Sequence, residues 1–307
     1  MDGFNLQALV RPNIWNLQAY HCARDDYTEG VLLDANENSF GPPVTPNELI
    51  FERYPCPYQQ ELKVQVAKYR GVDWTNVFVG VGSDEAIDML MRIFGVPGKD
   101  AIIQCPPTYG MYSVSAATND LSVVNVPLTP TMDVDLAAVQ KAITPLTKVI
   151  FICSPGNPAC KLVDKATVVA LLEAYTTGIV VVDEAYIDFA DDVAVSSCCD
   201  LVASGKYPNL VVLQTMSKAF GLAGIRCGFA IGSPEVIAVM SKVKAPYNIN
   251  KMTSSVALDA FKHLDVVQAK ISAIKVEKTK LRAALAALPF VKRILPSGAC
   301  HWPLQLM

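Results

Sequence analysis

The chain has 307 residues, of which 51% are hydrophobic and 18% charged, a composition typical of a globular protein with a large core. The formal net charge of -3, without a block of lysine or arginine, argues against nucleic acid or a membrane surface as a partner. No apolar run approaches the roughly 18 residues of a membrane-spanning helix, and the first residues lack a signal-peptide pattern, so we expect a cytoplasmic protein.

The nine cysteines are odd in number and scattered, and Cys198-Cys199 is the only close pair. This spacing gives neither a disulfide framework nor a CxxC metal site, so we expect reduced thiols that mostly serve packing. The three histidines, His21, His263 and His301, lie too far apart in the chain to show metal-ligand spacing. The sequence therefore predicts no metal.

Residues 1–45 are polar and irregular, with one short apolar run at 31–33, which indicates an arm more than a domain. A proline-stiffened loop follows at 53–58. Beyond it, an apolar stripe predicts a helix that Gly71 ends, with one face formed by Leu62, Val66 and Tyr69.

The segment 76–82 is predicted as a strand, and a helix begins at Ser83 with a core-facing stripe of Ile87, Leu90, Met91 and Phe94. Gly80 to Asp84 therefore place small residues and free backbone N–H groups at a helix N-terminus, which suits a phosphate. A dinucleotide-binding fingerprint would need a small residue at position 85, where Glu85 stands. The other alternative is a structural cap without a ligand.

Ala101 to Cys105 form another predicted strand, with Tyr109 shortly beyond its end. The Tyr109 ring could stack on a flat cofactor, or it could be a core or turn residue. A helix with the apolar positions Leu136, Val139 and Ile143 is predicted next, followed by a buried strand at 148–153. The loop 154–158 comes directly after this strand, which places Asn157 at a strand end.

A helix striped by Val168, Leu171 and Leu172 is predicted to end at Gly178, and the most apolar strand of the chain follows at 178–182. Asp183 and Tyr186 come directly after this strand. A carboxylate at the end of a buried strand is costly without a cationic partner, for which a protonated ring nitrogen is suited. A structural salt bridge is the alternative.

The next apolar strand, 210–213, leads into the segment Thr215 to Arg226. A lysine after a buried strand can be partly desolvated, which lowers its pKa and lets its amine hold an aldehyde cofactor as a Schiff base, so Lys218 is the candidate. Thr215, Ser217 and Arg226 would suit a phosphate on that cofactor. The alternative is a solvated surface lysine.

Short apolar strands, completed by 229–231, alternate with helices, which predicts a mainly parallel sheet with crossover helices. Ligands in such folds bind at the carboxyl ends of the strands, where the candidate residues all fall. From about 251 onward we predict a lysine-rich amphipathic helix or helix pair and then a strand at 291–295; the helical apolar positions include Val266, Ile271, Ile274 and Leu281.

Seven motifs occur together in the order and spacing of one family: Asp34–Gly41, Arg53–Pro55, Gly82–Glu85, Cys105–Tyr112, Ser154–Pro158, Val182–Tyr186 and Ser217–Phe229. On these motifs the chain resembles the histidinol-phosphate aminotransferases, from about residue 8 to 298. The resemblance implies a pyridoxal-phosphate-dependent transferase of fold type I, in the α/β class. The resemblance also implies a large domain built on a mainly parallel seven-stranded sheet between helices, and an incomplete small domain.

The domain division implied by the resemblance is an N-terminal arm with part of the small domain at 1–45, a large cofactor-binding domain at 46–245 and a truncated small domain at 246–307. Residues 300–307 match nothing in the family, which indicates a frameshifted or alternatively spliced tail. We therefore expect the strand at 291–295 to lack its neighbours and to present a bare edge. Ala159-Cys160 stand where the family has Thr-Gly.

By the resemblance, Lys218 binds the cofactor aldehyde and then moves a proton as general acid and base. Asp183 keeps the pyridine nitrogen protonated, Asn157 and Tyr186 hydrogen-bond the ring's phenolic oxygen, and Tyr109 stacks on the ring face. Lys218, Asp183 and Tyr186 are thus the expected catalytic residues.

The resemblance assigns cofactor binding through the phosphate to Gly82, Ser83, Asp84, Thr215, Ser217 and Arg226. Tyr54 would come from the other subunit of a homodimer, and Tyr20 and Asn36 would lie near the substrate. The implied reaction moves an amino group between L-histidinol phosphate and 2-oxoglutarate in histidine biosynthesis. The alternatives are an aromatic amino-acid transaminase, a decarboxylase of a phosphorylated amino acid, and a noncatalytic isoform that binds the cofactor or pairs with a full-length subunit.

Overall fold

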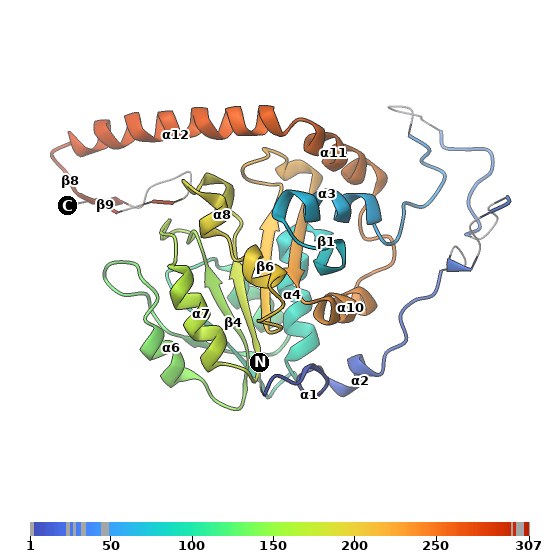
Figure 1. Ribbon diagram of the computed structural model, residues 1–307, viewed down its shortest axis with the longest axis horizontal. Helices are drawn as coiled ribbons and strands as arrows, with labels where there is room; N and C mark the ends of the chain where they lie inside the picture. The colour runs from blue at the N-terminus through green and yellow to red at the C-terminus, as the bar shows by residue number, and fades with distance from the viewer. Residues whose placement is uncertain are drawn as a thin grey trace.

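The computed structural model describes residues 3–22, 25–26, 29–31, 35–43, 49–295, 297–298 and, for the backbone, 304–306. In these residues the main feature is a seven-stranded sheet with helices on both faces (Figure 1). Its strand order is β1 (Val77–Val81), β7 (Cys227–Gly232), β6 (Leu210–Thr215), β5 (Ile179–Asp183), β4 (Thr147–Cys153), β2 (Ala101–Gln104), β3 (Ser122–Asn125). Strand β7 runs antiparallel to both of its neighbours and the other pairs are parallel, which confirms the predicted mainly parallel sheet.

The sheet is buried on both faces, which explains its runs of valine and isoleucine. Along β5, Val180 and Val182 join one half of the core and Ile179 and Val181 the other. The first half is covered by α3 (Gln60–Arg70), α7 (Lys165–Ala174), α9 (Cys199–Ala203) and α11 (Lys251–Lys262). The second is covered by α2 (Pro12–Trp15), α4 (Gly82–Phe94), α5 (Met111–Thr118) and α10 (Pro234–Val243). Because side chains alternate along a strand, Asp183 is directed to the side of α4 and α5.

Two predicted helix ends have different outcomes. Helix α3 ends at Gly71, whose φ of 70° is the left-handed conformation of a C-terminal cap, as predicted. Helix α7 ends at Ala174, so the prediction that Gly178 ends it is wrong. Gly178 serves packing instead: a Cβ there would overlap the hydroxyl of Tyr175, which donates a hydrogen bond of 2.7 Å to the Thr147 carbonyl.

The N-terminal segment is more closely packed than its polar sequence indicated. It forms the short helices α1 (Leu6–Leu9) and α2, and Val10 and Ile14 are buried in the core beside α4 and α10. After α2 the described parts of the chain lie away from the sheet (Figure 1), and Val31 is 83% exposed. The rest of the apolar run, residues 32 and 33, and the start of the first family motif at Asp34 lie outside the described residues.

The predicted C-terminal helix pair is present as α11 and α12 (Leu264–Ala286). Ile271 is buried, but Val266, Ile274 and Leu281 are 44%, 39% and 53% exposed, so the predicted stripe does not form one buried face. The reason is that the long α12 crosses one end of the molecule and extends past the sheet (Figure 1), and its buried residues, Val267 and Ile271, lie in the first turns.

The strand at 291–295 was expected to lack neighbours and present a bare edge, and this prediction is wrong for one of its two edges. Strand β8 (Val291–Ile294) pairs antiparallel with β9 (Leu304–Leu306), in a two-stranded sheet beside α12 (Figure 1). Its partner comes from the segment that matches none of the family motifs. Backbone pairing needs no particular side chains, so a motif comparison could not detect it.

From the sequence we also expected no membrane-spanning helix, no disulfide and no metal site. No helix within the described ranges is long and apolar enough to cross a membrane. The eight cysteines in the described part of the chain are free thiols, six of them buried. Among the same residues, no group of histidine, cysteine and carboxylate side chains is arranged to hold a metal ion.

The turn at 154–160 places Cys160, fully buried, at a φ of 59°. Its N–H donates to the Gly156 carbonyl at 2.8 Å, and its own carbonyl accepts from the N–H of Gly298 at 2.6 Å. The turn therefore forms without the glycine of the family motif, but with a side chain in the left-handed region.

We predict that Cys160→Gly is more stable than Cys160→Ala by about 1 kcal/mol in urea unfolding. Both changes remove the thiol, but only alanine keeps a Cβ at a left-handed backbone position. The neighbouring change Ala159→Gly is the control and should destabilise the chain, because its backbone is not left-handed. Equal stability of the two Cys160 variants would show that the backbone there is unstrained.

Candidate active site

A cavity of about 150 Å³ opens at the carboxyl ends of the parallel strands. It lies where β4, β5 and β6 end, against the start of α4 and the turn before β7. It is lined by Ser83, Asp84, Tyr109, Cys153, Asn157, Asp183, Ala185, Tyr186, Thr215, Ser217, Lys218, Ala223 and Arg226. Most of the candidate residues therefore meet here; Cys153, Ala185 and Ala223 were not anticipated.

One wall of the cavity is a close contact between the start of α4 and the start of β7. Gly82 has a φ of 70°, and its N–H donates to the Arg226 carbonyl at 3.0 Å. A Cβ on Gly82 would lie 2.6 Å from Nη2 of Arg226, and one on Gly228 would overlap the backbone of Gly82 and Ser83. Glycine at both positions lets the helix N-terminus and the guanidinium lie together. Gly228 was missed; its signal is a glycine inside an apolar strand, which often marks a close backbone approach.

Hydroxyl groups and a guanidinium surround the N-terminus of α4. Arg226 donates to Oγ of Ser217 at 3.2 Å and to the Asp84 carboxylate at 3.2 Å. The Thr215 hydroxyl lies 2.9 Å from the same Ser217 oxygen. Together with the helix dipole, these groups form a site that favours an anion with several oxygens.

Tyr109 is tied to this site through Asp84. Its hydroxyl donates to Oδ1 of Asp84 at 3.0 Å, while Oδ2 faces Arg226. Burial, with the Asp84 carboxylate nearby, raises the pKa of Tyr109 to about 12, so the hydroxyl stays a donor. The ring half-buried at the cavity wall is thereby held in one orientation.

Asp183 lies at the floor of the cavity and is 3% exposed. Its two oxygens accept hydrogen bonds from the Tyr112 hydroxyl at 2.7 Å and the Ala185 N–H at 3.1 Å. Burial raises the pKa of Asp183, and these two hydrogen bonds act in the opposite direction. No lysine, arginine or histidine in the described ranges forms an ion pair with it, so the alternative of a structural salt bridge finds no partner there.

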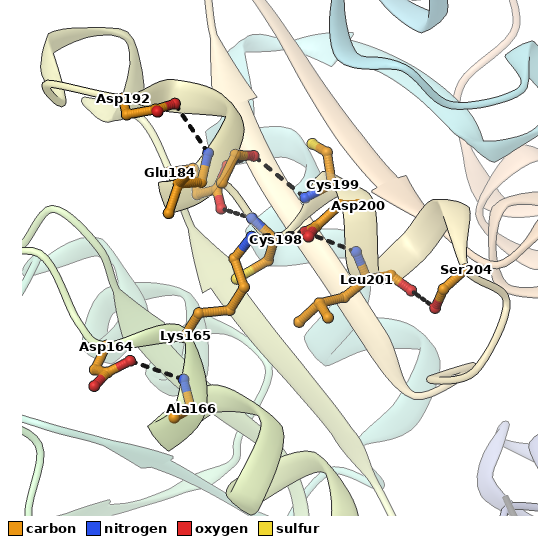
Figure 2. A network of polar contacts seen from close by, with 12 residues as sticks. Asp164, Lys165, Ala166, Glu184, Asp192, Cys198, Cys199, Asp200, Leu201 and Ser204 are labelled. Atoms are coloured by element: carbon orange, nitrogen blue, oxygen red, sulfur yellow. Dashed lines mark hydrogen bonds and ion pairs between the residues drawn. The ribbon is translucent and has the colours of Figure 1, made fainter.

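Glu184, the next residue, is buried on the opposite side of the strand. Its carboxylate accepts from the Cys198 N–H at 2.6 Å (Figure 2), from the Ser197 hydroxyl at 2.6 Å and from the Gln214 amide at 2.9 Å. The end of β5 is thus anchored on both sides, to α5 through Asp183 and to the start of α9 through Glu184. This second anchor was not predicted from the sequence.

Lys218 projects into the cavity from the turn after β6. Contrary to the predicted partial desolvation, the side chain is exposed, because the turn that carries it lies at the open side of the cavity. It makes no hydrogen bond or ion pair with any residue that the structure describes, and Nζ lies 5.2 Å from the centroid of the Tyr186 ring. The amine is therefore accessible to a ligand.

Three candidate residues do not reach this cavity. Tyr54 and Asn36 line a second cavity of about 500 Å³, between the arm and the start of α11. The Tyr54 ring stacks on Tyr247 with 4.6 Å between centroids. Tyr20 is 64% exposed and lines neither cavity. Within one chain, these residues are separate from Lys218.

The sequence matches the family model described as aminotransferase class I and II over residues 31–304. Among its relatives is a histidinol-phosphate aminotransferase of Cytophaga hutchinsonii, 44% identical over 298 residues, covering 96% of this chain and 83% of the relative. That of Candida maltosa is 45% identical over 312 residues, covering 94% and 79%. That of Saccharomyces cerevisiae is 43% identical over 309 residues, covering 94% and 79%.

Solved structures show the same fold. The histidinol-phosphate aminotransferase of Clostridium acetobutylicum superposes with a TM-score of 0.74 at 24% identity, covering 81% of this chain and 73% of that one. The enzyme of Sinorhizobium meliloti in complex with pyridoxal-5'-phosphate gives a TM-score of 0.74 at 24% identity, covering 86% and 72%. At this sequence identity, the likeness to these two structures shows the fold alone.

We predict that Asp183→Asn stabilises the cofactor-free chain by about 1–2 kcal/mol above neutral pH, because it removes a buried charge. The pKa of Asp183 in the folded chain is raised above its unfolded value. The protonated form of Asp183 is therefore favoured by folding. Its contribution to the free energy of unfolding is complete below the unfolded pKa and is lost as pH rises through the folded pKa. Thermal unfolding at several pH values tests this.

Asp191→Asn is the matched control, since that carboxylate is fully exposed, and it should change the free energy of unfolding by less than about 0.5 kcal/mol. A D183N chain that is less stable than the wild type at high pH, or equally pH-dependent, would contradict the buried-charge account.

Proposed function

The chain belongs to the aminotransferase class I and II family, and we propose that it is a pyridoxal-phosphate-dependent histidinol-phosphate aminotransferase. The reaction exchanges an amino group between L-histidinol phosphate and 2-oxoglutarate, as a step of histidine biosynthesis. The observation that carries the proposal is the meeting of an accessible amine, a buried carboxylate and an anion site in one cavity: Lys218, Asp183 and Arg226.

Pyridoxal phosphate fits the residues present. It needs an amine for its aldehyde, an anion site for its phosphate and an acidic partner for its ring nitrogen. The side-chain amine of Lys218 makes no hydrogen bond or ion pair with a described residue, and the carboxylate of Asp183 has acceptor capacity beyond its two donors. The space beside Arg226, which a Cβ on Gly82 would fill, leaves the helix N-terminus open to the phosphate.

Bound there, the cofactor supplies an aldehyde that links to amines and a protonated ring that withdraws electrons. Asp183 would hold the proton on the ring nitrogen, and Tyr109 would cover one ring face. Asn157 and Tyr186 would hydrogen-bond the phenolic oxygen. The amine of Lys218 moves a proton at the substrate carbon that carries the amino group, as general base and acid.

The phosphate would be held by the N-terminus of α4 and the turn before β7. Ser83 and the backbone N–H of Asp84 come from the helix, and Arg226 donates from across the cavity. Thr215 and Ser217 add hydroxyl donors. Arg226 is the main contributor, since a guanidinium binds phosphate through two parallel hydrogen bonds.

The active protein is a homodimer in this proposal, in which Tyr54 of the partner subunit completes the phosphate site. Support comes from the position of Tyr54, 49% exposed and outside the Lys218 cavity of its own chain. Tyr20 and Asn36, also exposed, would contact substrate. The division into an arm (1–45), a large domain (46–245) and a small domain (246–307) belongs to the same proposal.

We predict that borohydride treatment of the chain mixed with pyridoxal phosphate fixes the cofactor on the peptide that contains Lys218. Lys218→Ala should lose this adduct and at least about 10³-fold of activity, because a covalent and acid–base group is removed. Peptide mass spectrometry measures the adduct. The exposed Lys206→Ala is the control and should behave as wild type; an adduct that survives in K218A would remove Lys218 from this role.

Arg226→Lys should weaken binding of pyridoxal phosphate by about 10–100-fold, because lysine keeps the charge but loses the paired hydrogen bonds. Binding of pyridoxal, which lacks the phosphate, should change little. Fluorescence titration of the cofactor-free chain with both compounds measures the two effects. An equal loss for both compounds would contradict a phosphate contact at Arg226.

Amino-group transfer to the bound cofactor distinguishes the substrates. We expect the chain loaded with pyridoxal phosphate to convert with L-histidinol phosphate at least about 10-fold more efficiently than with L-phenylalanine. Stopped-flow absorbance follows each half-reaction. Preference for phenylalanine would indicate an aromatic transaminase, and no conversion by a cofactor-loaded chain would indicate a noncatalytic protein.

A further inference from the structure

Tyr112 is fully buried beneath the active-site cavity and contacts the residue at its floor. Its hydroxyl donates to Oδ2 of Asp183 at 2.7 Å. Its ring stacks on Phe151 of β4, with 4.6 Å between centroids and an interplanar angle of 19°. The ring is therefore fixed by packing, and its hydroxyl has a fixed direction.

The same helix start also carries Tyr109. Tyr112 lies in the first turn of α5, and its ring meets that of Tyr109 edge-on, with 5.7 Å between centroids and an angle of 86°. One helix N-terminus thus supplies a ring at the cavity wall and a donor beneath the floor. Any shift of α5 would move both groups relative to Asp183.

The hydrogen bonds to Asp183 leave part of its acceptor capacity unused. Each oxygen has one protein donor, the Tyr112 hydroxyl and the Ala185 N–H, whereas a carboxylate can accept about four hydrogen bonds. The Tyr112 hydroxyl occupies one oxygen from the side of α5. The remaining acceptor positions are available on the side of the cavity that Asp183 lines.

We propose that Tyr112 is a positioning residue that acts through Asp183: its hydroxyl keeps the buried carboxylate ionised and fixes the oxygens presented to the ring nitrogen of the cofactor. This inference rests on the proposed function. Tyr112 touches neither substrate nor cofactor in this role. One proton is shared between the ring nitrogen of the cofactor and the Asp183 carboxylate. Tyr112 controls what fraction of the time this proton is on the nitrogen.

The direction of the effect follows from simple acid–base chemistry. Burial favours the protonated form of Asp183, and a donor to the carboxylate favours the ionised form. Burial also raises the pKa of Tyr112 well above its ordinary value, so the hydroxyl remains a donor. Without it, the Asp183 carboxylate becomes more basic and draws the shared proton away from the ring nitrogen.

The test is the nitrogen-15 NMR shift of ring-labelled pyridoxal phosphate bound to the wild type and to Tyr112→Phe. Phenylalanine keeps the stacked ring and removes only the hydroxyl. We expect the shift to move toward that of the unprotonated ring, with the proton distribution between nitrogen and carboxylate changed about tenfold. Asp183→Asn, which cannot take up the proton, gives the reference for an unprotonated ring.

Tyr175→Phe is the matched control, because it also removes a buried tyrosine hydroxyl with a 2.7 Å hydrogen bond, but at the far end of the sheet. It should lower stability and leave the nitrogen shift unchanged. Should Y112F not fold, Phe151→Leu keeps the hydroxyl but removes its stacked support, and a smaller shift of the same sign is expected.

A nitrogen shift identical in Y112F and wild type would overturn the inference and leave Tyr112 as a packing residue. Failure of the proposed function would give a different result in this experiment, because the wild type itself would then not bind pyridoxal phosphate. A wild type that binds the cofactor with its ring unprotonated would also contradict the role given to Tyr112.

Discussion

A carboxylate buried at the end of a central strand is the constraint on which the site depends. Asp183 can stay ionised there only while donors meet its oxygens, and Tyr112 and Ala185 provide them. The alternation of side chains along β5 directs Asp183 toward α5 and Glu184 toward α9, where Glu184 has donors of its own. The strand end is therefore rigid, and a cationic group in the cavity would complete its charge balance.

The second constraint is steric. The N-terminus of α4 and the turn that carries Arg226 approach so closely that neither Gly82 nor Gly228 has room for a Cβ. This contact joins β1 with β7, the antiparallel strand of the sheet, and brings donors from two distant parts of the sequence to one point. The distance between this anion site and Asp183 is set by the strands between them, which fits a rigid cofactor better than a flexible ligand.

The sequence predicted the sheet and most of the cavity because the signals are local. Short apolar strands followed by polar residues place Asp183 and Lys218 at strand ends, and parallel strands bring such ends together. Tyr112 was missed because locally it is an ordinary helix residue, and Gly228 because a glycine inside an apolar strand indicates a close approach without showing what approaches. Their importance arises from contacts with Asp183 and Ser83, far away in sequence.

The remaining errors have the same origin. Gly178 reads as a helix terminator, but its role is to make room for Tyr175. Lys218 was expected to be partly desolvated, yet burial depends on which turn forms the open side of the cavity. Cys160 adopts a left-handed conformation that a cysteine side chain does not favour. Each of these depends on tertiary packing, which a pattern along the chain does not record.

A crystal structure of the chain with pyridoxal phosphate would test the account most directly, through the distance from the ring nitrogen to the Asp183 carboxylate. We expect a hydrogen bond of about 2.7–2.9 Å there, with the phosphate at the N-terminus of α4 beside Arg226. A cofactor whose ring nitrogen faces another group, or whose phosphate lies away from α4, would contradict it.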